Sequence, residues 1–241
     1  MKEKLKSIFR EPRSALVLKI LVFGGFLSLL KMGGFQALPV LFFLAAAFIL
    51  SSRARSASFL VLLATAIATV WILDDSLFLF LAVILYSFIF YLAVGIKELL
   101  IVHRSEWNFI KNLVLFYVLA LLFFVADKSS FFVFKYVLVF LAIFLLLREW
   151  LVFSDTTFHR RYFLTALVAA SLLMQILWAT ALLPLGPINS ANLMILVAYM
   201  ILDFTHKHFR GNINRQLILK NITIFVLLLL VILATTSWNV G

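Results

Sequence analysis

Long runs of apolar residues fill most of this chain, and short polar segments separate them. The runs are continuous and do not alternate with polar positions as the strands of a membrane barrel would. Runs of about 18 or more apolar residues predict spanning helices, because roughly 20 residues at about 1.5 Å each cross the hydrocarbon core. The pattern predicts helices at about 14–30, 36–51, 57–73, 76–96, 108–126, 130–149, 161–183, 190–204 and 217–236.

Residues with strong turn and cap preferences lie between these runs. Ser14 is the predicted N-cap of the first helix, because its hydroxyl can accept a bond from a first-turn amide. The segment 184–187, Pro-Leu-Gly-Pro, ends the seventh helix, since proline lacks an amide hydrogen and restricts the residue before it. Asn189 or Ser190 is then expected to cap the eighth helix.

Composition supports a membrane location. Of the 241 residues, 65% are hydrophobic and 13% are charged, whereas soluble domains are about half apolar and about a quarter charged. The chain has no cysteine, which excludes disulfides, thiolate metal sites and cysteine nucleophiles. The net charge of +11 would suggest nucleic acid in a soluble protein. Here we expect no nucleic-acid partner, because topology explains the basic residues.

The basic residues divide unevenly between alternate loops. The positive-inside rule assigns the richer set of loops to the cytoplasm. The N-terminus is therefore expected inside and the C-terminus outside, in the plasma (bacterial inner) membrane. We also expect the cytoplasmic cations to attract anionic lipid headgroups. Eighteen of the 21 Lys and Arg residues fall in one set, and only Lys31, Lys128 and Lys135 fall in the other.

The predicted fold is all-α, a polytopic transmembrane helical bundle of about nine helices, arranged as four hairpins plus a final helix. Residues 1–13 form a basic, amphipathic cytoplasmic N-terminus, residues 14–236 a single transmembrane domain, and residues 237–241 a short external tail. The basic start followed by an apolar run also resembles a signal peptide. We favour an uncleaved first helix, because no clear small-x-small cleavage site follows the run.

A group of acids and histidines near the predicted cytoplasmic helix ends is the most site-like feature. Glu98, Glu149 and Asp203 each lie near such an end, and His206 and His208 follow the last of them. Carboxylates and imidazoles bind divalent metals, so Asp203, His206 and His208 are candidate metal ligands. The three acids are also candidate ligand-binding residues. The alternative is a set of solvated or paired interface charges, since no established metal motif is present.

The interior of the predicted helices is nearly free of charge. Gln175 is the most polar side chain at depth, and it is a candidate ligand contact, although a bond across to another helix explains it as well. We expect no cofactor. All four histidines lie on the predicted cytoplasmic side, which excludes bis-histidine haem within the membrane, and no nucleotide-binding fingerprint is present.

Three functional hypotheses remain, and no motif decides between them. The leading hypothesis is a structural or accessory membrane subunit, which acts through helix and lipid contacts and can have other membrane subunits as partners. The alternative is a permease or channel for a weakly polar or lipidic solute, with its path near Gln175 and the short eighth helix. The third is a membrane enzyme with its site at the cytoplasmic acid and histidine residues.

Overall fold

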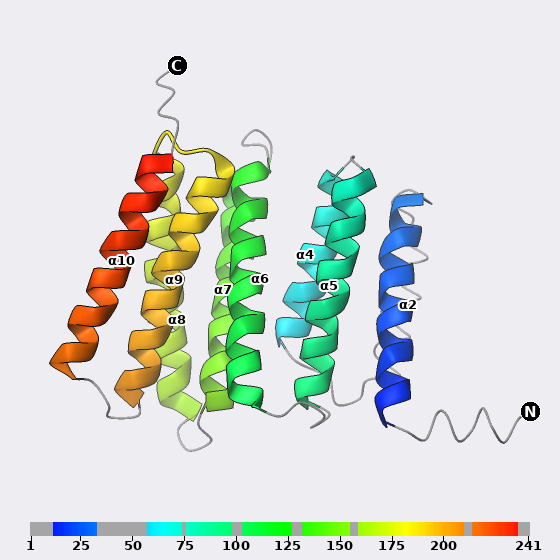
Figure 1. Ribbon diagram of the computed structural model, residues 1–241, viewed down its shortest axis with the longest axis horizontal. Coiled ribbons are helices and arrows are strands. Elements are labelled where there is room, and N and C mark those ends of the chain that lie inside the picture. The colour runs from blue at the N-terminus through cyan, green and yellow to red at the C-terminus, as the bar shows by residue number, and fades with distance from the viewer. Residues whose placement is uncertain are drawn as a thin grey trace, which may run out of the picture. The chain divides into compact units, whose positions relative to one another are not determined.

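The computed structural model describes residues 12–32, 57–73, 76–97, 103–126, 132–154, 159–209 and 214–235, and every regular element among them is an α-helix (Figure 1). The sequence predicts all eight of these helices, and their existence is confirmed. The predicted helix 36–51 lies outside the described residues, so the count of about nine and the orientation stay predictions. The helices are α2 (Pro12–Met32), α4 (Ala57–Ile72), α5 (Ser76–Lys97), α6 (Arg104–Val125), α7 (Phe132–Ser154), α8 (His159–Ala181), α9 (Pro187–Phe209) and α10 (Arg215–Thr235).

The start of α9 corrects one predicted cap. The amide of Ser190 donates to the carbonyl of Gly186 at 3.0 Å, so Gly186 is the N-cap and Pro187 is the first helical residue. Asn189 and Ser190 are therefore inside the helix. Proline suits the first position because first-turn amides have no partner within the helix, so its missing hydrogen costs nothing there. At its other end α9 continues to Phe209, beyond the predicted end near residue 204.

Two further helix starts lie earlier than the sequence indicates. Helix α2 begins at Pro12, so Ser14 is a helical residue and not the N-cap. Helix α6 begins at Arg104, about one turn before residue 108. The carbonyl of His103 accepts bonds from the amides of Glu106 and Trp107 at 3.1 and 3.2 Å, and His103 has a φ of 60°. The first turn of α6 thus consists of polar residues, and for this reason the apolar pattern predicted a later start.

The described chain divides into two compact units, Met1–Lys111 and Asn112–Gly241. In the first unit α2, α4 and α5 pack against one another. Helices α2 and α5 approach closely at Gly24, where an added Cβ would lie 3.0 Å from the Ser87 hydroxyl oxygen. Small residues allow such close approach of membrane helices. The single transmembrane domain predicted for residues 14–236 stays a prediction.

Polar contacts connect α4 to both of its neighbours. The hydroxyl oxygens of Thr69 and Tyr86 lie 2.6 Å apart and join α4 to α5. Lys31, in the last turn of α2, donates from Nζ to the carbonyl of Leu73 at 2.8 Å. This carbonyl lies just beyond α4, where backbone acceptors lack partners within the helix. The ends of α2 and α4 therefore lie together.

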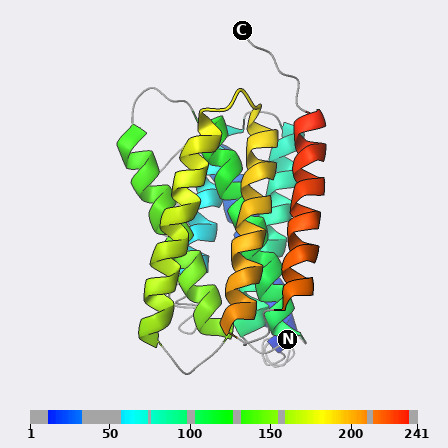
Figure 2. The same ribbon diagram turned by 90° about the vertical axis from the view of Figure 1, so that its left-hand side faces the viewer.

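In the second unit α7 packs on α8, α8 on α9 and α9 on α10. Figure 2 shows α8, α9 and α10 side by side, with a short connection between α8 and α9. Fully buried leucines on α7, α8 and α9 include Leu146, Leu173, Leu177 and Leu202. These contacts hold the α8–α9 corner against its neighbours.

Large apolar side chains cover the outer surfaces of the helices. Only 6% of the residues of α10 between Ile218 and Thr235 are buried. Such surfaces are unfavourable in water and fit the hydrocarbon of a bilayer. Six helices, α5 to α10, are long and apolar enough to cross a membrane, and α4 is a shorter apolar helix. This architecture is that of a membrane protein.

Candidate functional site

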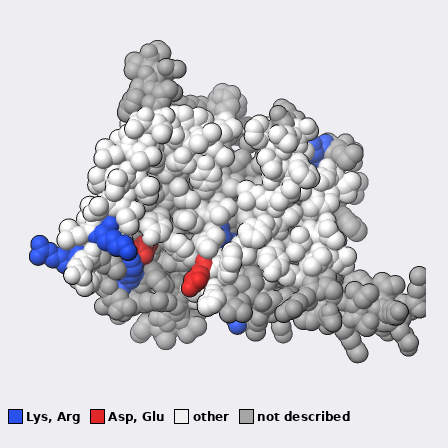
Figure 3. Space-filling model, in the orientation of Figure 1, with Lys and Arg blue, Asp and Glu red and all other residues white. Residues whose placement is uncertain are grey.

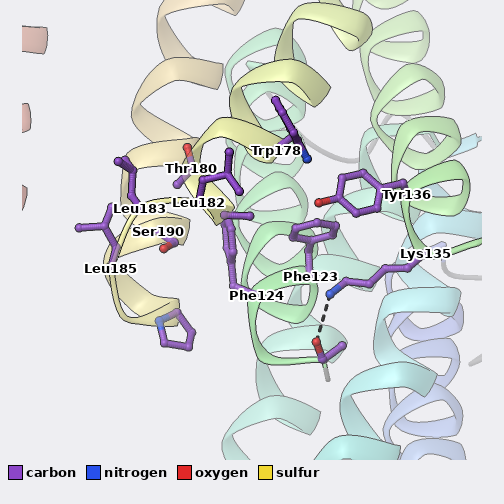
Figure 4. Close-up of a pocket in the computed structure, with 13 residues that line it drawn as sticks. Phe123, Phe124, Lys135, Tyr136, Trp178, Thr180, Leu182, Leu183, Leu185 and Ser190 are labelled. Carbon is purple, nitrogen blue, oxygen red and sulfur yellow. Dashed lines mark hydrogen bonds between the residues drawn. The ribbon is translucent and has the colours of Figure 1, made fainter. Parts of the chain in front are cut away.

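A pocket of about 320 Å³ lies among the end of α6, the start of α7 and the α8–α9 corner (Figure 4). We call it the Trp178 pocket. Ligand sites in proteins have volumes of roughly 300–1,000 Å³ and mostly apolar walls with a few polar groups. The described lining residues are Phe123, Phe124, Ala126, Lys135, Tyr136, Trp178, Thr180, Ala181, Leu182, Leu183, Leu185, Pro187 and Ser190.

Lys135 supplies the charged group of this pocket, and two contacts fix its ammonium. Nζ donates to the carbonyl of Ala126 at 3.0 Å and lies 4.1 Å from the centre of the Phe123 ring. The Ala126 carbonyl follows the last residue of α6, where acceptors lack partners within the helix. The aromatic face attracts the cation through its quadrupole. Lys135, a residue of α7, thus caps the C-terminal end of α6 with its ammonium group.

Aromatic side chains form the wall next to Lys135. The rings of Phe123 and Tyr136 meet edge to face, with their centres 5.0 Å apart. Figure 4 shows Trp178 beside Tyr136, with Phe124 on the other side of Phe123. Edge-to-face packing restricts the rings, so this wall is preformed.

The α8–α9 corner forms the opposite wall. The amides of Leu182 and Leu183 donate to the carbonyls of Ala179 and Thr180, both at 3.1 Å. The backbone therefore forms a tight turn directly after α8. This turn leaves Leu182 exposed at the rim. The hydroxyl-bearing residues Thr180 and Ser190 are buried behind it. The pocket therefore combines apolar walls, one cation and two buried hydroxyl groups.

Gln175, the polar residue predicted at depth, is exposed on α8 and does not line the pocket. Trp178 lies almost one turn further along the same helix and does line it. The sequence suggested a solute path near Gln175 and the short eighth predicted helix, and the pocket includes Trp178 from the helix that carries Gln175. The ligand role of Gln175 stays a prediction.

Asp203 has partners on two helices. Its Oδ2 accepts from Nζ of Lys207 at 2.6 Å and from Nδ2 of Asn221, on α10, at 2.5 Å. Because α9 continues to Phe209, Asp203 is in its interior and not at its end. Figure 3 shows that the charged side chains over α9 and α10 gather at one end, where α9 ends and α10 begins. Through its bond with Asn221, Asp203 joins α9 to α10.

The structure describes only some of the other acids and histidines of this predicted site. Glu149 is half-buried on α7, and His208 is exposed on α9. Glu98 lies outside the described residues, and only the backbone of His206 is described. Within the described part of the chain no three His, Cys, Asp or Glu side chains group as metal ligands would. The metal role of Asp203, His206 and His208 stays a prediction.

Sequence reasoning missed a buried polar group on α6. Lys111 is 2% exposed and donates from Nζ to the hydroxyl oxygen of Ser58, on α4, at 2.9 Å. Asn108 and Asn112, on the same face of α6, are also buried. The spacing of Asn108, Lys111 and Asn112 at i, i+3 and i+4 within an otherwise apolar helix could have indicated this group.

Comparisons with known proteins add no assignment. No family model matches the chain, and neither the curated proteins nor the solved structures provide a match. The site therefore has to be interpreted from its own geometry.

Proposed function

We propose that this membrane protein binds a lipidic, amphiphilic solute in the Trp178 pocket. The supporting observation is the composition of that pocket, in which apolar walls enclose a fixed cation. This proposal develops the hypothesis of a permease or channel for a weakly polar or lipidic solute. The site itself supports binding, and transport would require a further path.

The distribution of side chains explains why the solute should be amphiphilic. Phe124 and the leucines of the α8–α9 corner provide contact surface for methylene groups. Lys135 and the hydroxyl of Ser190 can donate to oxygen atoms of a polar headgroup. Exposed Trp178 and Leu182 stand at the rim, so a tail can continue from the pocket into the surrounding lipid.

Filling the pocket tests the proposal. Ala181→Trp puts an indole into the space that Ala181 lines, whereas Ala179→Trp changes an exposed residue of the same helix that does not line it. Both proteins would be purified in mild detergent, and their bound amphiphiles extracted and quantified by mass spectrometry. We expect bound amphiphile in the unchanged protein and in Ala179→Trp, and a large loss in Ala181→Trp.

Equal amphiphile content in the two tryptophan variants would refute the proposal, provided that both elute as monodisperse protein. The variant Lys135→Met distinguishes recognition of the headgroup from recognition of the tail. Loss of the cation should weaken retention of anionic amphiphiles and leave an uncharged one of equal chain length bound. If this variant retained anionic and uncharged amphiphiles equally well, Lys135 would have no role in recognition.

The accessory-subunit hypothesis has one supporting observation of its own. Helix α10 packs against α9, and only 6% of its residues between Ile218 and Thr235 are buried. A partner helix seated on it would bury Leu227 and Leu230, which are both exposed. A fixed-stoichiometry partner that co-purifies with the unchanged protein and is lost in Leu227→Trp, with the amphiphile content unchanged, would favour this function.

A further inference from the structure

The Trp178 pocket lies at one end of the helices of the second unit, to which all its described lining residues belong. The candidate membrane spans of α6 and α8 end at Val125 and Ala181, and those of α7 and α9 begin at Phe134 and Pro187. Residues at or next to these four limits line the pocket. The pocket therefore lies where the four spans would leave the hydrocarbon of a bilayer.

Aromatic residues at this end indicate the level of the lipid headgroups. Trp178 is exposed on α8, Tyr136 lies near the start of α7, and Figure 4 shows the two side chains near each other. Trp and Tyr are enriched at membrane interfaces, because each combines an apolar ring with one polar group. Lys135 precedes Tyr136 directly, so its ammonium lies at a depth that suits a charged headgroup.

The other cations of the second unit lie at the opposite ends of its helices. Arg148 lies near the end of α7, Lys207 lies in the last turn of α9, and Arg215 and Lys220 lie in the first two turns of α10. Among the side chains that the structure describes in this unit, Lys135 is the single Lys or Arg at the pocket end. Cytoplasmic segments carry the excess of Lys and Arg, so the pocket end is expected on the outer side.

The rim of the pocket is apolar. Leu182 is 68% exposed and Leu183 is 44% exposed, and Trp178 is 52% exposed beside them. Exposed apolar side chains of this size are unfavourable in water and fit lipid. The rim therefore suits contact with acyl chains, and a ligand would enter sideways from a leaflet of the membrane.

We propose that the Trp178 pocket takes an anionic lipid from the outer leaflet, with its headgroup against Lys135 and its acyl chain leaving past the apolar rim. This inference rests on the proposed binding of an amphiphile, and it adds the leaflet that supplies the ligand. A lipid of the outer leaflet already has its headgroup at the level of Lys135. A lipid of the cytoplasmic leaflet would first have to carry its charge across the hydrocarbon, which is unfavourable.

Photolabelling from one side of the membrane tests the proposal. The probe is a lysophosphatidylglycerol with a diazirine in its acyl chain, added to right-side-out or to inverted membrane vesicles of cells that express the protein. Its negative headgroup keeps it in the leaflet to which it is added. Ala181→Trp, which fills the pocket, gives the background from other lipid-exposed surfaces, and Ala179→Trp is its matched control outside the pocket.

We expect labelling above this background to be at least about tenfold stronger in right-side-out than in inverted vesicles, because a charged headgroup crosses the hydrocarbon only at a high cost. Equal labelling from both sides, or stronger labelling in inverted vesicles, would overturn the choice of leaflet. The same probe in detergent tests binding by itself. Labelling in detergent that Ala181→Trp does not reduce would refute the proposed function, and this inference with it.

A second measurement locates the pocket end without any lipid probe, because the chain has no native cysteine. Pro184→Cys changes an exposed residue of the α8–α9 corner that does not line the pocket, and Gln216→Cys changes an exposed residue in the first turn of α10. An impermeant thiol reagent should label Pro184→Cys in right-side-out vesicles and Gln216→Cys in inverted ones. The reverse pattern would overturn the outer-leaflet assignment and leave binding in detergent unaffected.

Discussion

Replacing Asn221 by alanine should loosen α10 from α9. The Asn221 side chain donates across to the Asp203 carboxylate, and Asn221 is buried. Helix α10 packs against α9 and is otherwise largely exposed, so few apolar contacts compensate for the lost bond. The variant leaves Asp203 with Lys207 as its remaining described partner.

The surroundings of Asp203 indicate how much free energy its bond with Asn221 contributes. Hydrogen bonds to charged groups contribute about 1.5–3 kcal/mol in soluble proteins. Bonds between membrane helices average about 0.6 kcal/mol and reach about 1.7 kcal/mol. The Asp203 side chain is 16% exposed, which favours a strong bond, but the Lys207 ammonium at 2.6 Å already offsets part of its charge. We therefore expect a coupling between Asp203 and Asn221 of about 1.5 kcal/mol, or about tenfold in the unfolding equilibrium.

A double-mutant cycle measures this coupling directly. Asp203→Ala, Asn221→Ala and the double variant would be unfolded reversibly in mixed micelles and followed by circular dichroism. Thr223→Ala is the matched control, because the Thr223 hydroxyl donates to the Leu219 carbonyl of its own helix at 2.8 Å and is exposed. It should change stability by less than about 0.5 kcal/mol. Additive effects of Asp203→Ala and Asn221→Ala would refute the reasoning.

Two further predictions concern membrane topology and proton leak. Single cysteines at Ser154 and Ser237 should be labelled from opposite sides of the membrane by an impermeant thiol reagent, because the nine-helix topology separates them; labelling of both from one side would contradict it. Reconstituted vesicles should hold an imposed pH gradient as well as protein-free vesicles do, measured with a trapped pH-sensitive dye, because Lys207 and Asn221 already hold the Asp203 carboxylate. A leak that disappears in Asp203→Asn would show that this carboxylate carries protons.

The sequence predicts the existence of the described helices well because membrane spans have a strong local signal. Apolar length is set by the bilayer and requires no knowledge of neighbouring helices. Helix ends were harder to predict, since they depend on which group satisfies the first amides. At α9 the Gly186 carbonyl and Pro187 begin the helix, although Ser190 has the stronger intrinsic cap preference.

The pocket could be predicted only as a region, because its walls come from distant parts of the chain. Phe123 comes from α6, Lys135 from α7 and Trp178 from α8. Which face of α8 points inward depends on packing against α7 and α9, and an apolar helix without a polar stripe does not reveal it. For this reason Gln175 was a reasonable candidate from the sequence, and yet it is exposed.

The described charged side chains Lys111 and Asp203 are held by partners within the protein, which supports the proposal of binding without ion coupling. Lys111 counts toward the cytoplasmic cations in the sequence, but it is buried against Ser58, and Asp203 is bonded within the protein in the same way. Coupled transporters typically place ionisable groups, or broken helices with free backbone groups, near the middle of the membrane. The central turns of α5, α8 and α10 contain no Asp, Glu, Lys or Arg, and these helices are continuous. The proposed lipidic solute would need neither feature, because its headgroup would contact Lys135 inside the Trp178 pocket and its tail would leave past Trp178 and Leu182.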